Sequence, residues 1–307
     1  MKYLFVFSSF FLFGFICAQK EKEVKVDIHG ETMYGTLTSV SGGTKAPVVI
    51  IIPGSGPTDR NGNSGIMQMN TYRMLAESFA ENGIASLRYD KLMIGKSQTK
   101  NLKEENLTFE NNTEWVLAWV DFLAQKKYQH IILVGHSEGS LIGMLAAQQG
   151  KVDKYISLEG AGRPIDEILY EQISAQSEEL GQKCKPYLDK LKTGELIDVV
   201  PKDLEAIFRK SVQPYLISWM KYDPKIEIAK LDIPTLIVQG STDIQVTTKD
   251  SERLAEGAPN AQYVLINGMS HILKDGPEER TANILTYYNP KLPLNKDLID
   301  TLIRFIQ

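Results

Sequence analysis

Cysteine, histidine and basic charge are scarce in this sequence. There are two cysteines, Cys17 and Cys184, and four histidines in 307 residues. Loss of an N-terminal leader would remove Cys17, so the mature chain would have no intramolecular disulfide, and a chain of this length buries enough surface without one. No Cys/His cluster has zinc spacing, and no glycine fingerprint for phosphate is present. We therefore expect chemistry that needs no metal or organic cofactor.

The weak net charge and the lack of a long apolar run exclude two kinds of partner. With a formal charge of −4 and no basic stripe, nucleic acid is not an expected partner. The longest apolar stretch, Leu4 to Ile16, is too short for a comfortable membrane span. Because it follows Lys2 and precedes Ala18, residues 1–18 are predicted to be a signal peptide of an exported, periplasmic or secreted bacterial protein. An uncleaved anchor is the alternative; after cleavage, no stable membrane span is expected.

Strand-like and helix-like segments alternate through most of the chain. An antiparallel hairpin is predicted over 23–38, with its turn at His29-Gly30. Apolar runs that predict buried strands lie at 47–52, 84–89, 131–134, 155–160, 234–240 and 261–266, and helical spacing is found at 69–82, 115–127 and 298–307. Asn112-Thr113-Glu114 is the expected cap of the second helix. This order predicts an α/β fold with a mainly parallel sheet covered by helices on both faces.

The alternation stops between about residues 163 and 229. That region has no long buried strand, only charged helical stretches. We interpret it as a helical insertion that forms a lid over the site, within one domain of residues 19–307. Ordinary crossover helices are the alternative.

The segment Gly135-His136-Ser137-Glu138-Gly139 carries the strongest chemical signal. It matches G-x-S-x-G, follows the run 131–134 and leads into a helix-like stretch. A strand that turns at once into a helix brings backbone segments very close, which requires glycines on both sides and lifts the serine hydroxyl out of the sheet. Ser137 is therefore predicted to be a nucleophile. The alternative is a tight turn that only packs.

A serine nucleophile needs a base, and four histidines make the search short. His29 lies in the hairpin, His130 at the wrong end of its strand, and His136 at a turn position that points elsewhere. His271 follows the last predicted strand. Ligands in open α/β sheets bind at the carboxyl ends of strands, so His271 is the predicted base.

The acid should follow another strand. Asp243 comes directly after the strand 234–240, whereas Asp232 precedes that strand. Asp250 and Asp275 lie in or beside predicted helices, where solvent exposure would explain them. Asp243 is therefore the predicted acid, and the order Ser137, Asp243, His271 is that of nucleophile, acid and base in α/β-hydrolases.

From Pro47 to Gln307 the chain resembles the α/β-hydrolase superfamily, and more narrowly bacterial carboxylesterases of the branch often labelled serine-aminopeptidase-like. The resemblance rests on residues 53–57, 135–139, 239–243 and 268–271. The loop after Ile52 departs from many lipases because it reads Pro-Gly-Ser-Gly rather than a His-Gly version. The resemblance implies an oxyanion hole from the backbone N–H groups of Glu138 and Ser55. Asp59 and Arg60 are expected to anchor this loop rather than touch substrate.

The resemblance implies a serine esterase acting on a small-molecule carboxylic ester through an acyl-enzyme. The insertion has no large apolar stripe, which favours short or medium acyl groups. One alternative is a small-peptide or amide hydrolase; another is a non-catalytic binding protein on the same fold. The sequence predicts no oligomeric state.

Overall fold

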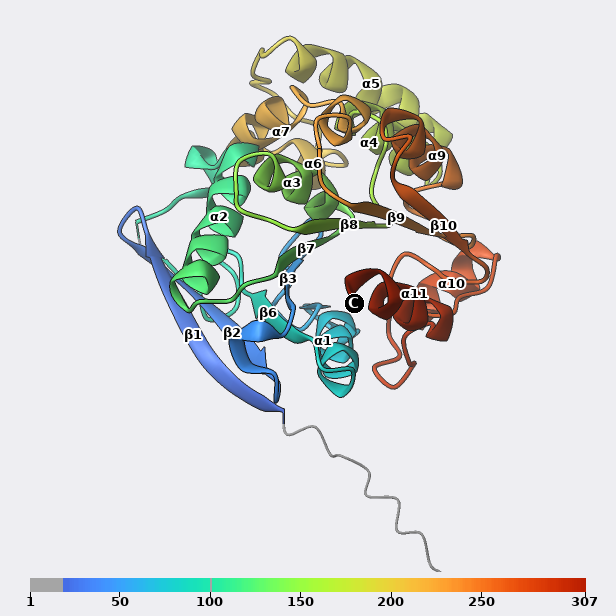
Figure 1. The fold of residues 1–307 in the computed structure, drawn as a ribbon. Helices are drawn as coiled ribbons and strands as arrows, with labels where there is room; N and C mark the ends of the chain where they lie inside the picture. Colours follow the sequence, from blue (N-terminus) through green and yellow to red (C-terminus); the bar gives the residue numbers. More distant parts are fainter. Residues whose placement is uncertain (1–18, 100) are drawn as a thin grey trace, which may run out of the picture.

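A single eight-stranded sheet forms the centre of the protein (Figure 1). The computed structural model describes residues 19–99 and 101–307, so the predicted signal peptide lies outside the described residues. The strand order is β1-β2-β6-β3-β7-β8-β9-β10. The first two pairings, β1 with β2 and β2 with β6, are antiparallel, and all the others are parallel. The expected mainly parallel α/β sheet is confirmed.

The strands fall where the apolar runs predict them. Their bounds are β1 Lys20–Ile28, β2 Glu31–Ser39, β3 Val48–Ile52, β6 Ala85–Tyr89, β7 Ile131–His136, β8 Lys154–Leu158, β9 Thr235–Gly240 and β10 Gln262–Ile266. A separate small hairpin pairs β4 (Asn63–Ser64) with β5 (Met67–Gln68). The leading hairpin turns at His29 (φ 51°) and Gly30 (φ 80°), the pair of positive φ values that suits a two-residue hairpin loop.

Helices cover both faces of the sheet and create two apolar cores. On one face, α1 (Thr71–Glu81) and α11 (Lys296–Ile306) pack on β3 and β7 through side chains such as Phe79 and Leu302. On the other face, α2 (Phe109–Gln125) and α3 (Glu138–Ala147) pack through Trp119 and Met144, with α9 (Thr248–Gly257) beside them. Successive residues of β3 point to opposite faces of the sheet. Because helices cover both faces, all five residues of β3 are buried.

The region between β8 and β9 is a helical insertion with a core of its own. It contains α4 (Ile165–Ser174), α5 (Glu178–Lys192), α6 (Glu205–Phe208), α7 (Gln213–Trp219) and α8 (Pro224–Ile228). Leu188, Leu191 and Phe208 are buried inside it. In Figure 1 these helices gather beyond α3, on one side of the sheet. The insertion was expected; its role as a lid stays a prediction.

The start of α2 was predicted wrongly. The helix begins at Phe109, six residues before the expected start, and Asn112 and Thr113 are buried within it rather than capping it. Thr108 is the true cap, and it forms a reciprocal capping box with Asn111. A Thr or Asn side chain can cap a helix at either place, so the local pattern alone does not decide between them.

The remaining elements are short and lie outside the predicted pattern. They are α10 (Arg280–Thr286) and three 3-10 turns at Gly43–Lys45, Glu104–Asn106 and Lys210–Val212. Helix α9 contains Asp250, which was placed in or beside a predicted helix for which no bounds were given. Among the described residues, no helix has the length and apolar character needed to cross a membrane.

Candidate active site

Ser137 stands at the tight turn between β7 and α3. Its backbone is strained, with φ 55° and ψ −122°. The glycines on either side are required by contact: a Cβ on Gly135 would lie 2.2 Å from the Gly139 carbonyl oxygen, and one on Gly139 would lie 2.4 Å from the Ile52 oxygen. The sequence pattern therefore corresponds to a real steric demand, and the turn presents the hydroxyl of Ser137 to a cavity.

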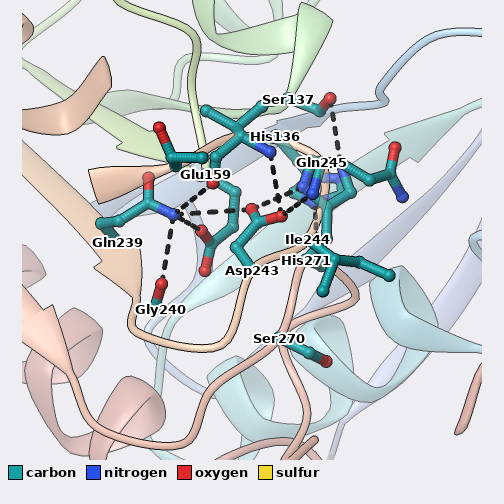
Figure 2. Close-up of polar contacts among 12 residues, drawn as sticks. His136, Ser137, Glu159, Gln239, Gly240, Asp243, Ile244, Gln245, Ser270 and His271 are labelled. Carbon is teal, nitrogen blue, oxygen red and sulfur yellow. Dashed lines mark hydrogen bonds and ion pairs between the residues drawn. The ribbon is translucent and has the colours of Figure 1, made fainter. Parts of the chain in front are cut away.

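The structure brings Ser137, His271 and Asp243 together (Figure 2). His271 Nε2 lies 3.1 Å from Ser137 Oγ, so it can accept the hydroxyl proton. The other ring nitrogen, Nδ1, lies 2.7 Å from Asp243 Oδ2 and donates to it. Ser137 is thus joined in one hydrogen-bonded chain to two residues that lie more than 100 positions later in the sequence. This geometry permits nucleophilic acyl transfer by general-base activation of the serine.

Asp243 is buried and fully occupied by hydrogen bonds. Its Oδ1 accepts from the backbone N–H groups of Gln245 (2.7 Å) and Val246 (3.0 Å), while Oδ2 faces His271. Burial alone opposes ionisation of this carboxyl. The charge of His271 and the hydrogen bonds to Asp243 outweigh burial and lower its pKa. Asp243 is therefore an ionised acceptor held in one orientation.

His136 is not placed to act as the base, but it supports the base. Its Nδ1 lies 2.8 Å from the Tyr72 hydroxyl, and its Nε2 lies 2.7 Å from the backbone oxygen of His271. Burial, followed by the nearby His271, lowers the pKa of His136 to about 3. A neutral His136 accepts from Tyr72 through Nδ1 and donates to His271 through Nε2. Sequence reasoning missed this role, because the partner lies 135 positions away.

The loop after β3 runs against the nucleophile. A Cβ on Gly54 would lie 3.1 Å from Ser137 Cβ, and Ser55 and Ser137 line the same cavities. The Gly54 peptide is held on both sides: its N–H donates to Tyr72 Oη (3.0 Å), and Lys91 Nζ donates to its carbonyl (2.9 Å). The structure thus fixes the backbone where the resemblance implies an oxyanion donor.

Glu138, the other donor that the resemblance implies, is the first residue of α3, where an N–H has no partner within the helix. The Glu138 carboxylate is held by contacts with two other side chains. Oε1 accepts from the Tyr215 hydroxyl (2.7 Å), and Oε2 lies 3.5 Å from Lys91 Nζ. The oxyanion roles of Ser55 and Glu138 stay predictions.

Asp59 and Arg60 anchor the loop, as expected. Asp59 Oδ1 accepts from the backbone N–H groups of Asn61 and Asn63, and Arg60 forms an ion pair with the buried Asp90 at 2.7 Å. These local contacts account for both charged residues.

Asp250 does not have the solvent exposure expected for it. Its side chain is buried and accepts two hydrogen bonds from the Arg163 guanidinium (2.8 and 3.0 Å) and one from the Gly162 N–H (3.1 Å). The sequence shows an acidic residue in a polar helix, which is typical of a solvated face. The partner that buries it comes from the segment before α4.

Three cavities meet near Ser137. One of about 130 Å³ contains Ser137 and Ser55 and is walled by Leu141, Ile168 and Trp219. A second of about 400 Å³ contains Ser137 and His271. A third of about 360 Å³ lies beyond Glu138. The hydroxyl of Ser137 therefore borders a small, mostly apolar cavity and a larger one.

A mainly parallel sheet with Ser137 at a strand–helix turn and an acid and a histidine after later strands defines the class of protein. The chain has the α/β-hydrolase fold.

Comparison with known proteins agrees. No family model matches the chain. It is similar to esterase EstD of Thermotoga maritima, with 24% identity over 302 residues covering 94% of this chain and 67% of EstD. Among solved structures it is similar to Est1E from Butyrivibrio proteoclasticus with ferulic acid bound (21% identity, TM-score 0.60, 92% of this chain and 99% of that one). It is also similar to the α/β hydrolase GrgF from Penicillium (18% identity, TM-score 0.60, 94% and 98%).

The chain therefore has the α/β-hydrolase fold, and its similarity to EstD is carboxylesterase-like, in agreement with the resemblance seen in the sequence. The catalytic roles of Ser137, Asp243 and His271 stay a prediction, addressed next.

Proposed function

We propose that this protein is a serine esterase that hydrolyses small carboxylic esters with short to medium acyl groups through an acyl-enzyme. The observation that carries this proposal is the hydrogen-bonded chain from Ser137 Oγ to His271 and on to Asp243. Similarity to EstD, itself called an esterase, favours esters over other acyl substrates.

The reaction has two steps. His271 Nε2 takes the proton as Ser137 Oγ attacks the ester carbonyl carbon, and Asp243 offsets the positive charge on the ring. The oxyanion is stabilised by the N–H groups of Glu138 and Ser55; each such donor typically lowers the barrier by about 3–4 kcal/mol. The carbon–oxygen bond then breaks, and the alcohol leaves with the proton from His271. Water, deprotonated by His271, attacks the acyl carbon; the carbon–Oγ bond breaks, His271 returns the proton to Ser137 Oγ, and the acid is released.

Cavity size supports the limit on acyl length. The compartment of about 130 Å³ beside Ser137 is small and its lining is mostly apolar, with Ile165, Ile168 and Leu169 of α4 on one side. A short acyl group suits such a space, whereas a long chain would need the helices of the insertion to move.

The test is turnover by the chain from Gln19 onward and by Ser137→Ala. p-Nitrophenyl acetate, butyrate and longer esters would be assayed beside aminoacyl-p-nitroanilides. We expect ester hydrolysis that falls with acyl length and drops at least about 10³-fold in Ser137→Ala. Ser78→Ala, a remote serine on α1, is the matched control and should be fully active.

Two results would contradict the proposal. Anilide cleavage with little ester turnover would favour the amide hydrolase. Equal turnover by the wild type and Ser137→Ala would show that Ser137 is not the nucleophile. No turnover of either panel would reject the proposed hydrolysis.

A further inference from the structure

A second carboxyl group lies behind the acid of the site. Glu159 follows β8 directly, and its side chain is fully buried. Its backbone has φ 49°, a conformation that residues other than glycine rarely adopt. It packs against Gly240 at the end of β9, where a Cβ would come 2.8 Å from Glu159 Oε1. Figure 2 shows Glu159 and Gln239 grouped beside Asp243, on the side away from Ser137. The mechanism above uses neither residue.

Gln239 fixes the orientation of this second carboxyl. Gln239 Nε2 donates to Glu159 Oε2 and to the Val246 carbonyl (3.0 Å), and lies 3.5 Å from Asp243 Oδ2. Glu159 Oε1 is buried and has no hydrogen-bond donor among the described residues. A buried carboxylate oxygen without a donor is costly, and a proton on the group removes that cost.

The charges around Glu159 and Asp243 also require that one of these two carboxyl groups carries a proton. The ionisable groups facing them are His271, His136, Tyr287 of the α10 end, and Arg280, whose guanidinium donates to the Ile244 carbonyl. His136 is neutral, Arg280 forms no ion pair with either carboxyl group among the described residues, and one imidazolium at His271 balances only one carboxylate. The side chains of Glu159 and Asp243 are within hydrogen-bond contact of each other, and two buried carboxyl groups so placed do not both ionise.

The proton belongs on Glu159 rather than on Asp243. Asp243 already accepts from two backbone N–H groups and from His271, all of which favour its ionised form. Burial, and next the negative charge of Asp243, raise the pKa of Glu159 well above its ordinary value.

We propose that Glu159 is a positioning residue that stays protonated and donates a hydrogen bond to Asp243, holding that carboxylate in place against His271. The inference rests on the proposed function for its catalytic consequence, but its structural part can be tested without turnover.

Two variants separate the hydrogen bond from simple packing. Glu159→Leu keeps a side chain of similar size and removes the proposed O–H donor. Glu159→Gln keeps an N–H donor in a neutral group of the same size. We expect Glu159→Leu to lower kcat about 10- to 100-fold with little change in KM, because small misplacements in a site have effects of that order. Glu159→Gln should recover most of the loss. Equal activity of the Leu variant and wild type, or a Gln variant as poor as Leu, would overturn the role.

The pH profile tests the charge. If Glu159 is neutral, Glu159→Gln leaves the midpoint of the acid limb of kcat/KM unchanged. If Glu159 were ionised, the same substitution would remove a negative charge beside His271, disfavour the imidazolium, and move that midpoint to lower pH. Such a shift would contradict the inference.

Two spectra report on the free protein and so distinguish this inference from the proposed function. The infrared difference between wild type and Glu159→Gln at neutral pH should contain the C=O stretch of a protonated carboxylic acid. The downfield proton resonance of His271 Nδ1–H should persist in Glu159→Gln and shift in Glu159→Leu. An ionised carboxylate band, or a resonance unmoved in both variants, would overturn the inference even if the enzyme is an esterase. Both expected spectra in a protein inactive on esters would retain it and reject the proposed function.

Discussion

At the scale of single residues, one hydroxyl connects the loop after β3 with the histidine loop. Tyr72 Oη accepts from the Gly54 N–H and donates to His136 Nδ1, and His136 in turn donates to the His271 carbonyl. Each of these polar atoms is buried, so each needs its partner. The two loops that contribute to the site are therefore fixed relative to each other before any substrate binds.

Tyr72→Phe tests this connection. The ring is retained, but the Gly54 N–H loses its acceptor and His136 loses its donor. We expect the free energy of unfolding to fall by about 1–3 kcal/mol and kcat/KM for the best ester to decrease. Urea denaturation and ester turnover would measure both, with the exposed Tyr288→Phe as control. A variant as stable and as active as wild type would show that the hydroxyl does not hold the loops.

At the scale of elements, an ion pair between the half-buried Arg163 and the buried Asp250 connects the insertion to α9. Arg163, just before α4, reaches Asp250 of α9 and also Glu171 of α4 at 2.5 Å. The backbone N–H groups of Gly162 and Arg163 donate to the same Asp250 carboxylate. Five N–H donors of Gly162 and Arg163 thus meet the carboxylates of Asp250 and Glu171 at the point where the insertion leaves the sheet.

Asp250→Ala should be strongly destabilising because two guanidinium nitrogens of Arg163 and the backbone N–H groups of Gly162 and Arg163 lose their acceptor, and Arg163 keeps only Glu171. The expected loss in the free energy of unfolding is about 3 kcal/mol, measured by urea denaturation. Asp189→Ala, which breaks the exposed pair with Lys185, should cost no more than about 0.5 kcal/mol. Equal effects of the two substitutions would mean that the Asp250 pair contributes no more than a surface contact.

The elements that sequence predicted well are those with a local signal. The hairpin at His29-Gly30 and the buried strands are visible in periodicity and turn residues, and Ser137 is visible through the two glycines that its turn requires. The start of α2 failed because two possible caps lie within a few residues of each other. Local patterns define where a strand or turn forms, and less well where a helix begins.

The parts of the site that sequence missed depend on contacts between distant segments. His136 meets the backbone of His271, and Glu159 meets Gln239 and Asp243 only because β8 and β9 are neighbours in the sheet. A glutamate after a strand has no local feature that marks it as buried or protonated. Asp250 was misjudged for the same reason.

At the scale of the whole molecule, one lysine lies buried between the loop that carries His271 and the segment just before α1. Lys274, three residues after His271, is fully buried and donates from Nζ to the Met69 carbonyl at 2.7 Å, just before α1. Burial lowers the pKa of Lys274 to about 8. Its folded pKa is thus below the value of about 10.4 expected in the unfolded chain.

This difference predicts the direction of a pH effect on stability. Between about pH 8 and pH 10 the unfolded chain binds more protons at Lys274 than the folded chain, so this group's contribution to stability rises with pH in that range. Comparison of wild type with Lys274→Met by urea denaturation at several pH values isolates it. The Met variant should lack the rise. Parallel pH dependence in the two proteins would show that Lys274 titrates at its ordinary pKa.

The central claim is that Ser137 forms a covalent acyl intermediate, and trapping that intermediate is its most direct test. Wild-type protein mixed with p-nitrophenyl butyrate would be quenched in acid, digested and examined by mass spectrometry, with Ser137→Ala treated in parallel. The account predicts a butyryl group on the peptide that contains Ser137, and none on the variant. Turnover by wild type with no adduct, or with the acyl group on another residue, would contradict it.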